Sequence, residues 1–348
     1  MKKILIIGGG VAGCSLAWQL SKKGVRVKLL DKKENKSSFV AAGIINPMVF
    51  RRMNLSWRAD EFLPYALAFY GELEKEMQEK FCVPLRIRRF FSSEQERNFW
   101  QQKQELKEYQ DFLTHYNNFD ESIANSKGKH GSALVKKGFR VDSLRFMTTF
   151  HRYLIANKIL EYSEFNSNEF NPETLTYQTV KYDFVVFCCG SDNYLTPYFR
   201  DIKIEHTKGQ MITVESNEIN EQESWNHKGF LLPIGNNRFK VGATIEREVR
   251  DTKTTPAALK ELRGVLENLT NSSYTVIKQV AGIRPTVYDR RPVMGQHPNH
   301  DGLYIFNGLG TKGYLMAPLL SEEMASFIMG EKPLHREVQL ARFYKNKS

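Results

Sequence analysis

Three glycines near the N-terminus have the spacing of a phosphate-binding turn. Gly8, Gly10 and Gly13 lie between a short apolar run and a helical pattern. In such a turn the first glycine permits the bend, the second lets the backbone approach a pyrophosphate, and the third lets helix and strand pack closely. Asp31 ends the next apolar run, 18 residues after Gly13, where a carboxylate can bind ribose hydroxyls. These residues predict a dinucleotide site; the alternative is a glycine turn that only packs a helix on a sheet.

The segments around these residues have the pattern of a βαβ unit. Residues 3–7 are apolar and β-branched, residues 11–23 have helical periodicity, Gly24 ends that helix, and residues 25–30 form a second apolar run. Further helices are predicted at residues 57–79, 93–116, 144–157, 256–269 and 314–329. Further strands are predicted at residues 131–141, 184–187, 230–233, 239–244 and 303–306. Segments typical of a dinucleotide-binding domain thus lie at both ends and in the middle of the sequence. The segments between them are charged and are predicted to contain antiparallel strands.

Several short motifs follow the glycine turn in a fixed order. They occupy residues 37–44, 183–190, 208–211, 241–246, 281–286, 289–295 and 308–313. In this order the sequence resembles the D-amino-acid oxidase superfamily of FAD-dependent oxidoreductases. That superfamily includes glycine oxidase, sarcosine oxidase and the oxidase domain of the bifunctional tRNA wobble-uridine enzyme. The resemblance covers nearly the whole chain.

The resemblance implies an α/β fold with two discontinuous domains. One is a Rossmann-like FAD-binding domain, placed at residues 1–82, 140–200 and 284–348. The other is an inserted α+β substrate domain on a mostly antiparallel sheet, placed at residues 83–139 and 201–283. The residues expected to bind FAD are Gly8, Gly10, Val11, Ala12, Gly13, Asp31, Lys32, Ser38, Ala42, Gly43, Gly190, Gly310, Thr311, Lys312, Gly313 and Tyr314.

The resemblance also implies the chemistry. A small amine or amino acid, in its neutral form, gives the hydrogen of the carbon next to nitrogen as hydride to flavin N5. The resulting imine is hydrolysed, and O2 or another electron acceptor reoxidises the flavin. The cofactor supplies the redox chemistry, whereas the protein supplies placement and electrostatic field.

Three cations are candidates for catalytic roles. In glycine oxidase-like members the arginine that matches Arg284 binds the substrate carboxylate, which suits a planar guanidinium; the alternative is an ion pair with Asp289. A lysine matching Lys240 lies beside the flavin in sarcosine oxidase-like members, although period-two alternation of Lys240, Gly242 and Thr244 also allows a solvent face. Lys312 could add positive charge beside the reduced flavin, together with the N–H groups of residues 310–313; alternatively it caps a surface turn.

Several positions depart from the relatives. Phe230 replaces the tyrosine of glycine oxidase-like enzymes, and Thr311 replaces their second arginine. Phe39 and Gly43 replace the histidine and arginine that follow the paired serines in sarcosine oxidase. A cysteine for covalent flavin attachment has no counterpart near Ile283, so we expect non-covalent FAD.

Composition places the chain among globular proteins. Apolar content of 41% and charged content of 26% are ordinary, and no apolar run reaches the roughly 18 residues that span a bilayer. The N-terminal residues resemble a signal peptide with a lipoprotein box, but cleavage there would remove the first strand and the phosphate turn. Four cysteines without zinc or CxxC spacing favour a reducing, cytoplasmic compartment. No histidine forms a metal-binding pattern.

Two other functions remain open on the sequence. The turn at residues 308–313 resembles that of the tRNA enzyme more than that of glycine oxidase, and the net charge of +11 would aid phosphate binding. Basic clusters at residues 51–52, 86–89 and 127–140 could form a tRNA-binding face. A tRNA-modifying oxidase acting on a carboxymethylaminomethyl wobble uridine is therefore the alternative. A non-catalytic flavin scaffold or exported lipoprotein is the third hypothesis.

Overall fold

A six-stranded sheet forms the centre of one half of the molecule. The computed structural model describes residues 1–33, 37–115 and 129–344. The strand order is β10-β2-β1-β14-β22-β21, and every neighbouring pair is parallel except β21–β22. The strands are β1 (Lys3–Ile7), β2 (Arg26–Asp31), β10 (Leu160–Tyr162), β14 (Phe184–Phe187), β21 (Val293–Gln296) and β22 (Leu303–Asn307). The inner strands β1, β14 and β22 are nearly continuous apolar runs because the middle of a parallel sheet is covered on both faces.

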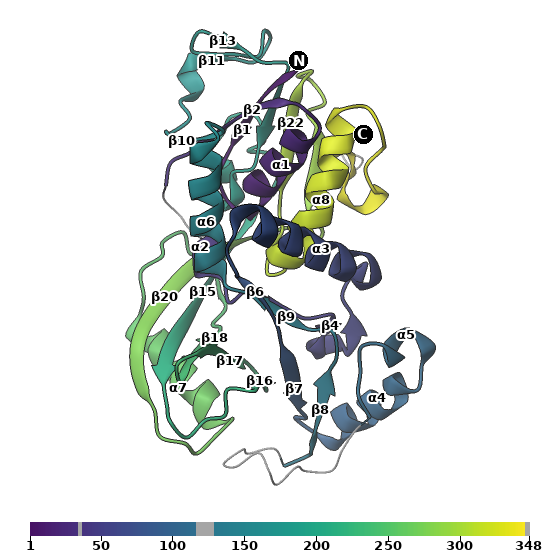
Figure 1. Cartoon of the computed structure of the whole chain (residues 1–348), viewed down its shortest axis with the longest axis vertical. Coiled ribbons are helices and arrows are strands. Elements are labelled where there is room, and N and C mark those ends of the chain that lie inside the picture. The colour runs from purple at the N-terminus through teal and green to yellow at the C-terminus, as the bar shows by residue number, and fades with distance from the viewer. Residues whose placement is uncertain (34–36, 116–128, 345–348) are drawn as a thin grey trace.

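Alternate residues of β1 enter two different cores. Ile4 and Ile6 pack with four helices, which are α1 (Val11–Lys22), α3 (Ala59–Met77), α6 (Ser143–Ala156) and α8 (Gly313–Ile328). Figure 1 shows these helices grouped on one face of the sheet. Leu5 and Ile7 instead join a cluster that includes Phe170 and Tyr177. Those two aromatics belong to a small sheet of β11 (Phe170–Asn171), β12 (Thr176–Tyr177) and β13 (Val180–Lys181).

An eight-stranded sheet forms the other half, in the lower part of Figure 1. Its order is β19-β15-β18-β17-β16-β7-β8, and β20 pairs with β15; only β7 and β16 pair in parallel. The strands are β7 (Arg86–Phe90), β8 (Ser132–Val135), β15 (Glu205–Glu215), β16 (Glu223–Asn226), β17 (Phe230–Gly235), β18 (Arg238–Gly242), β19 (Glu246–Arg247) and β20 (Thr275–Thr286). Helix α7 (Pro256–Glu267) covers one face through Leu262 and Leu266. Trp100 of α4 (Glu94–Gln104) and Tyr109 of α5 (Lys107–Gln110) pack with Ile87 and Leu232.

Short elements connect the two halves. Two small sheets join β3 (Ile44–Ile45), β9 (Phe139–Val141) and β6 (Cys82–Pro84), and β4 (Met48–Val49) with β5 (Asn54–Leu55). Helix α2 (Ser37–Val40) contacts both α6 and β20. The remaining short helices are η1 (Phe50–Arg52), η2 (Ser167–Glu169), η3 (Gly190–Leu195), η4 (Arg336–Val338) and η5 (Leu340–Phe343). The mixed α/β fold predicted from the sequence is confirmed, whereas the exact domain boundaries stay a prediction.

Three local predictions were wrong. The helix expected at residues 93–116 is two helices, α4 and α5, separated at Glu105 and Leu106, and its predicted end lies outside the described residues. The polar composition of the segment from Lys332 predicts a loose tail, but the segment is packed, because Leu334, Val338 and Leu340 are buried. The two longest strands, β15 and β20, were not predicted as strands at all.

Candidate functional site

A cavity of about 590 Å³ lies between the two large sheets. Its walls come from the ends of β1, β2 and β14, from α2 and the start of α8, and from residues of β15, β17 and β20. The volume is within the range of small-molecule and cofactor sites. Among the residues predicted to bind FAD, all except Gly13 line this cavity, and Arg284 lines it too.

The glycine turn is packed so tightly that side chains would not fit. A Cβ atom on Gly13 would lie 2.0 Å from the carbonyl oxygen of Gly8, and a Cβ on Gly8 would lie 2.4 Å from that of Cys188. Gly13 therefore does not line the cavity, and it is the glycine of the motif that lets α1 pack closely against the turn. Gly8 also has a φ of +105°, which favours glycine.

The N-terminus of α1, which directly follows this turn, faces the cavity. Ser38 Oγ accepts a hydrogen bond from the Val11 N–H at 3.0 Å. Asp31 Oδ1 accepts one from the Gly9 N–H at 3.0 Å. A Cβ on Gly10 would meet only Ser38 Oγ within 4 Å, at 3.3 Å, so the backbone can be approached closely there. The amides and the helix dipole make this end of the cavity suitable for a pyrophosphate.

The second glycine turn, at residues 308–313, brings a lysine into the cavity wall. Lys312 Nζ donates hydrogen bonds to Asn46 O at 3.0 Å and to Ser56 Oγ at 2.6 Å. Burial lowers the pKa of Lys312 to about 8. Lys312 is therefore held inside the protein and does not cap a surface turn, whereas Thr311 is exposed. Tyr314 fixes the start of α8, since its hydroxyl donates to Ser38 O at 2.5 Å.

The Arg284 side chain lies across Gly209 of β15. A Cβ on Gly209 would lie 2.0 Å from Arg284 Nη2, so the guanidinium covers the place where another residue would have a side chain. Nη1 donates to Thr244 O at 3.3 Å. The expected alternative partner, Asp289, instead binds Arg342 Nε at 2.9 Å. Among the described residues no carboxylate pairs with Arg284, and burial lowers the pKa of its guanidinium.

Lys240 does not line the cavity, but it contacts a residue of the cavity wall. Its Nζ donates to Ala41 O at 3.3 Å, and Ala41 is a lining residue. Burial lowers the pKa of Lys240, so the side chain is not fully solvated. Gly242 lines the cavity, but β18 ends there, so the alternation expected to place Thr244 on the same face does not continue.

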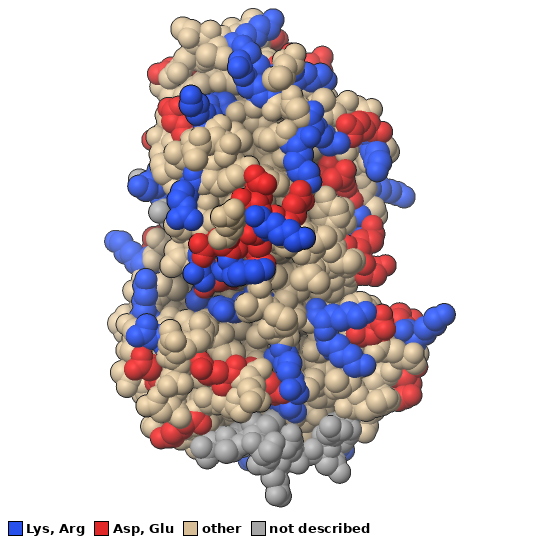
Figure 2. Space-filling view, in the orientation of Figure 1, with Lys and Arg blue, Asp and Glu red and all other residues tan. Residues whose placement is uncertain are grey.

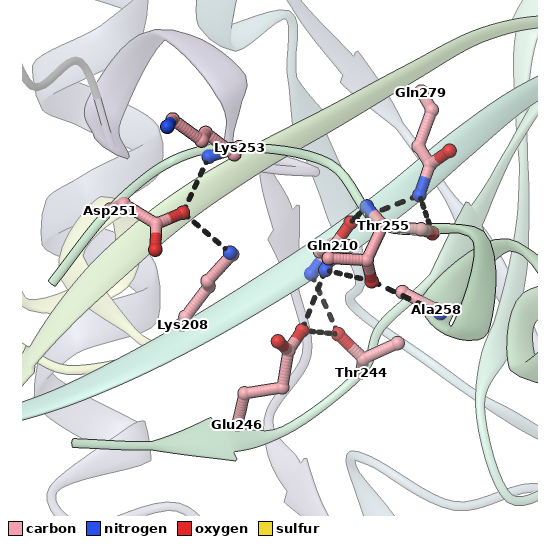
Figure 3. Close-up of polar contacts among 9 residues, drawn as sticks. All are labelled: Lys208, Gln210, Thr244, Glu246, Asp251, Lys253, Thr255, Ala258 and Gln279. Atoms are coloured by element: carbon pink, nitrogen blue, oxygen red, sulfur yellow. Dashed lines mark hydrogen bonds and ion pairs between the residues drawn. The ribbon is translucent and has the colours of Figure 1, made fainter. Parts of the chain in front are cut away.

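A polar network anchors the chain that follows β18 (Figure 3). Gln210 is fully buried, and its amide accepts hydrogen bonds from Thr255 N and Gln279 Nε2 and donates to Glu246 Oε1 and Thr255 Oγ1. Thr244 Oγ1 donates to Glu246 Oε1 and accepts from Gln210 N. Nearby, the buried Lys208 pairs with Asp251 at 2.9 Å. The network fixes the residue whose carbonyl accepts the Arg284 hydrogen bond.

Sequence reasoning missed several residues at this site. Asn46 and Ser56 hold Lys312, Asn307 donates from its amide to Gly190 O at 3.0 Å, and His151 contacts Gly9. Asn307 directly precedes the predicted glycine turn, which is a usable signal. The other three lie far along the chain from their partners, and nothing in their local sequence marks them.

Other kinds of site are not supported. Within residues 1–33, 37–115 and 129–344 no cluster of His, Cys, Asp and Glu could hold a metal ion. All four cysteines are free. Burial raises the pKa of Cys189, which lines the cavity, to about 12, so its thiol stays protonated and is a poor nucleophile. No helix in the described ranges has both the length and the apolar character needed to cross a membrane.

The fold and the glycine turn define a dinucleotide-binding α/β protein. The family described as DAO, FAD dependent oxidoreductase, matches residues 3–327. The chain belongs to this family, and it is an FAD-dependent oxidoreductase.

Individual relatives are distant but extend over most of the chain. It is 24% identical to glycine oxidase of Bacillus licheniformis, over 94% of this chain and 92% of that protein. It is 22% identical to the tRNA 5-methylaminomethyl-2-thiouridine biosynthesis bifunctional protein MnmC of Marinobacter nauticus, over 99% of this chain but only 59% of that protein. The crystal structure of glycine oxidase from Geobacillus kaustophilus superposes with a TM-score of 0.82 at 18% identity, covering 99% and 98% of the two chains.

The cavity fits the cofactor of this family. The backbone amides at Gly10 and Val11 and the carboxylate of Asp31 would hold the pyrophosphate and ribose, and Lys312 with the start of α8 would face the flavin. The flavin supplies a hydride acceptor at N5. The protein would supply positive charge to the cofactor from Lys312 and Arg284, which both line the cavity.

Proposed function

We propose that the protein oxidises the C–N bond of a small amino acid or amine that carries a carboxylate. The observation that supports this most directly is Arg284, a guanidinium in the cofactor cavity without a carboxylate partner among the described residues. Removing a cation from water without a counterion is costly, so such a group is retained where a ligand supplies the anion. A planar carboxylate matches the guanidinium with two hydrogen bonds.

The other cavity walls limit the rest of the substrate. Phe230, Met211 and Ile87 line the cavity, and the first two lie beside Gly242. They are apolar and cannot supply a base, which suits an amine that binds in its neutral form. The carbon next to nitrogen gives its hydrogen with two electrons to FAD, the imine takes up water to give a carbonyl compound and a free amine, and O2 or another acceptor removes the electrons.

Lys240 and Lys312 are assigned separate parts of this proposal. Lys312 places a cation beside the cavity at the N-terminus of α8, where it would stabilise the negative charge of the reduced flavin. The hydrogen bond from Lys240 Nζ to Ala41 O supports a role for Lys240 in holding the cavity wall, without contact to the substrate. We retain a cytoplasmic location as an expectation from the four free cysteines.

A tRNA substrate has less support. Some cations of the basic clusters expected to bind phosphate form ion pairs within the protein: Arg86 and Arg88 share Glu223, Arg89 pairs with Glu96, and Lys137 pairs with Asp111. Figure 2 shows positive and negative side chains intermixed on the face in view. Part of the third cluster, at residues 127 and 128, lies outside the described residues. Arg51 and Arg52 are exposed, and within the described part of the chain no carboxylate pairs with either of them.

The test compares each amino acid with the same amine lacking the carboxylate, for example alanine with ethylamine. Purified holoprotein is mixed anaerobically with each compound, and bleaching of the flavin band near about 450 nm is followed. We expect the wild type to prefer the amino acid, and Arg284→Ala to lose at least about tenfold of that preference, because each charge-assisted hydrogen bond contributes about 1.5–3 kcal/mol. The exposed Arg247→Ala serves as the matched control. Bleaching by no amine, or an unchanged preference in Arg284→Ala, would refute the proposal.

A further inference from the structure

A buried histidine on α6 binds the backbone of the phosphate turn from outside the cavity. His151 is 3% exposed, and its Nε2 lies 2.7 Å from the carbonyl oxygen of Gly9. The two residues are 142 positions apart in the sequence. The histidine does not line the cofactor cavity, so neither substrate nor flavin chemistry explains its position.

The hydrogen-bond partners determine the role of each ring nitrogen. A carbonyl oxygen can only accept, so Nε2 must carry the proton. In the neutral ring Nδ1 is then an acceptor, and Tyr162 Oη lies 3.0 Å from it. The hydroxyl of Tyr162 therefore donates to His151, and His151 donates to Gly9. This order selects one tautomer and aims it at the turn.

The ring is held by packing as well as by hydrogen bonds. Phe39 packs edge-on against the imidazole, with ring centroids 5.1 Å apart, and Tyr162 lies at 5.8 Å. Cys14 Sγ is a second and weaker donor to Gly9 O, at 3.3 Å. Because the imidazole is fixed on several sides, it can define the direction of the Gly9 carbonyl.

That direction determines where the next amide points. The carbonyl of Gly9 and the N–H of Gly10 belong to one planar, trans peptide, so they point in opposite directions. With the carbonyl bound to His151, the Gly10 N–H is directed away from α6. Gly10 lines the cavity beside Val11 at the start of α1, where a pyrophosphate is expected. A glycine on each side makes this peptide able to rotate unless something holds it.

We propose that His151 is a positioning residue for FAD, which orients the Gly9–Gly10 peptide so that the Gly10 amide is preset for the pyrophosphate. The inference rests on the family cofactor and not on the identity of the amine substrate. Preorganisation of this kind raises affinity because the peptide need not be ordered when the ligand binds. Tyr162 acts one step further away, by selecting the tautomer of His151.

The experiment measures FAD release from the purified holoprotein after dilution, followed by the rise in free flavin fluorescence. His151→Leu removes both nitrogens, His151→Gln can keep a donor near the position of Nε2, and Tyr162→Phe removes only the outer hydroxyl. The matched control is His297→Leu. His297 Nε2 also binds a backbone carbonyl, that of Tyr198, at 3.0 Å, but it does not line the cavity. Unfolding temperatures are recorded for every variant.

We expect FAD release to accelerate at least about fivefold in His151→Leu and about threefold in Tyr162→Phe, as the loss of one hydrogen bond implies. His151→Gln should stay within about twofold of the wild type, and His297→Leu should lose thermal stability without faster release. The proposal is overturned if His151→Leu and His297→Leu release FAD equally fast, or if the glutamine variant is no better than leucine. If His151→Leu does not fold, an unchanged release rate in Tyr162→Phe overturns it. Failure of the amine-oxidation proposal would leave these rates unaffected.

Discussion

A methyl group at Gly209 should displace Arg284 without removing its charge. A Cβ at this position would lie 2.0, 2.4 and 2.6 Å from Nη2, Cζ and Nη1 of Arg284. Non-bonded heavy atoms settle at about 3.5 Å, so the guanidinium must move by about 1.5 Å. The contacts are with the end of a long side chain, and Gly209 has no positive φ. The backbone can therefore accept alanine while the arginine yields.

The displacement has a defined energetic consequence. Hydrogen bonds to a carboxylate require donor–acceptor distances of about 2.7–3.2 Å, so a shift of this size disrupts at least one of the two bonds that Arg284 offers. Each such bond contributes about 1.5–3 kcal/mol. Affinity for a carboxylate should fall by roughly ten- to a hundredfold. The free energy of unfolding should change by less than about 1 kcal/mol, because no packed backbone is forced apart.

The assay uses acetate as the simplest carboxylate and follows the flavin absorption spectrum during titration of the holoprotein. Gly264→Ala is the control, since a Cβ on this glycine of α7 would meet no heavy atom within 4 Å beyond its own helix, and Gly264 does not line the cavity. It should bind acetate as the wild type does. The reasoning is refuted if Gly209→Ala binds acetate with unchanged affinity while Arg284→Ala does not, because the side chain would then have room that the structure denies it.

Three further predictions concern the turn, the lysine and the buried amide. Gly13→Ala should lose FAD and destabilise the protein by about 3 kcal/mol, because its methyl group would meet backbone at 2.0 Å; urea unfolding and bound-flavin absorbance test this, and a stable, flavin-loaded variant would contradict it. Burial lowers the pKa of Lys312 from 10.5 to about 8. Between these pH values the unfolded chain binds a proton that the folded protein lacks. The free energy of unfolding should therefore rise with pH in this range, relative to that of Lys312→Met. The two FAD-free proteins are unfolded in urea at several pH values, and a difference in the free energy of unfolding that does not change with pH would contradict the prediction. Gln210→Leu leaves the partly buried Thr255 amide and Glu246 carboxylate without this partner and should cost about 2–4 kcal/mol. Gln279→Leu, at a partly exposed position, should cost less in the same denaturation experiment.

The βαβ unit and the cofactor turn could be predicted because their signals are local. Residues 3–31 contain the strands, the helix, the three glycines and the acidic residue within one short segment. Arg284 and Lys312 were found through the family resemblance, and the structure places both in the cavity wall. Their roles in catalysis stay predictions.

The strand β15 was not predicted, in part because three of its buried residues are polar. On β15, His206, Lys208 and Gln210 are all buried, yet a sequence pattern treats such residues as solvent-facing. Their burial is made possible by distant partners, such as Ser191 O for His206 and Asp251 for Lys208. Likewise, the tail beyond Lys332 reads as polar although Leu334, Val338 and Leu340 are buried in the cores. In each case the deciding contact lies far along the chain.

The order of the six-stranded sheet also sets the timing of cofactor loading during synthesis. The central strands β1 and β14 come from residues 3–7 and 184–187, but β14 is completed on its other edge only by β22, at residues 303–307. Lys312 and the start of α8 follow still later. A nascent chain that has emerged as far as α7 therefore exposes one edge of β14 and has only part of the flavin cavity. FAD should be captured only after residues 303–313 have emerged, and until then the chain must avoid aggregation without help from its cofactor.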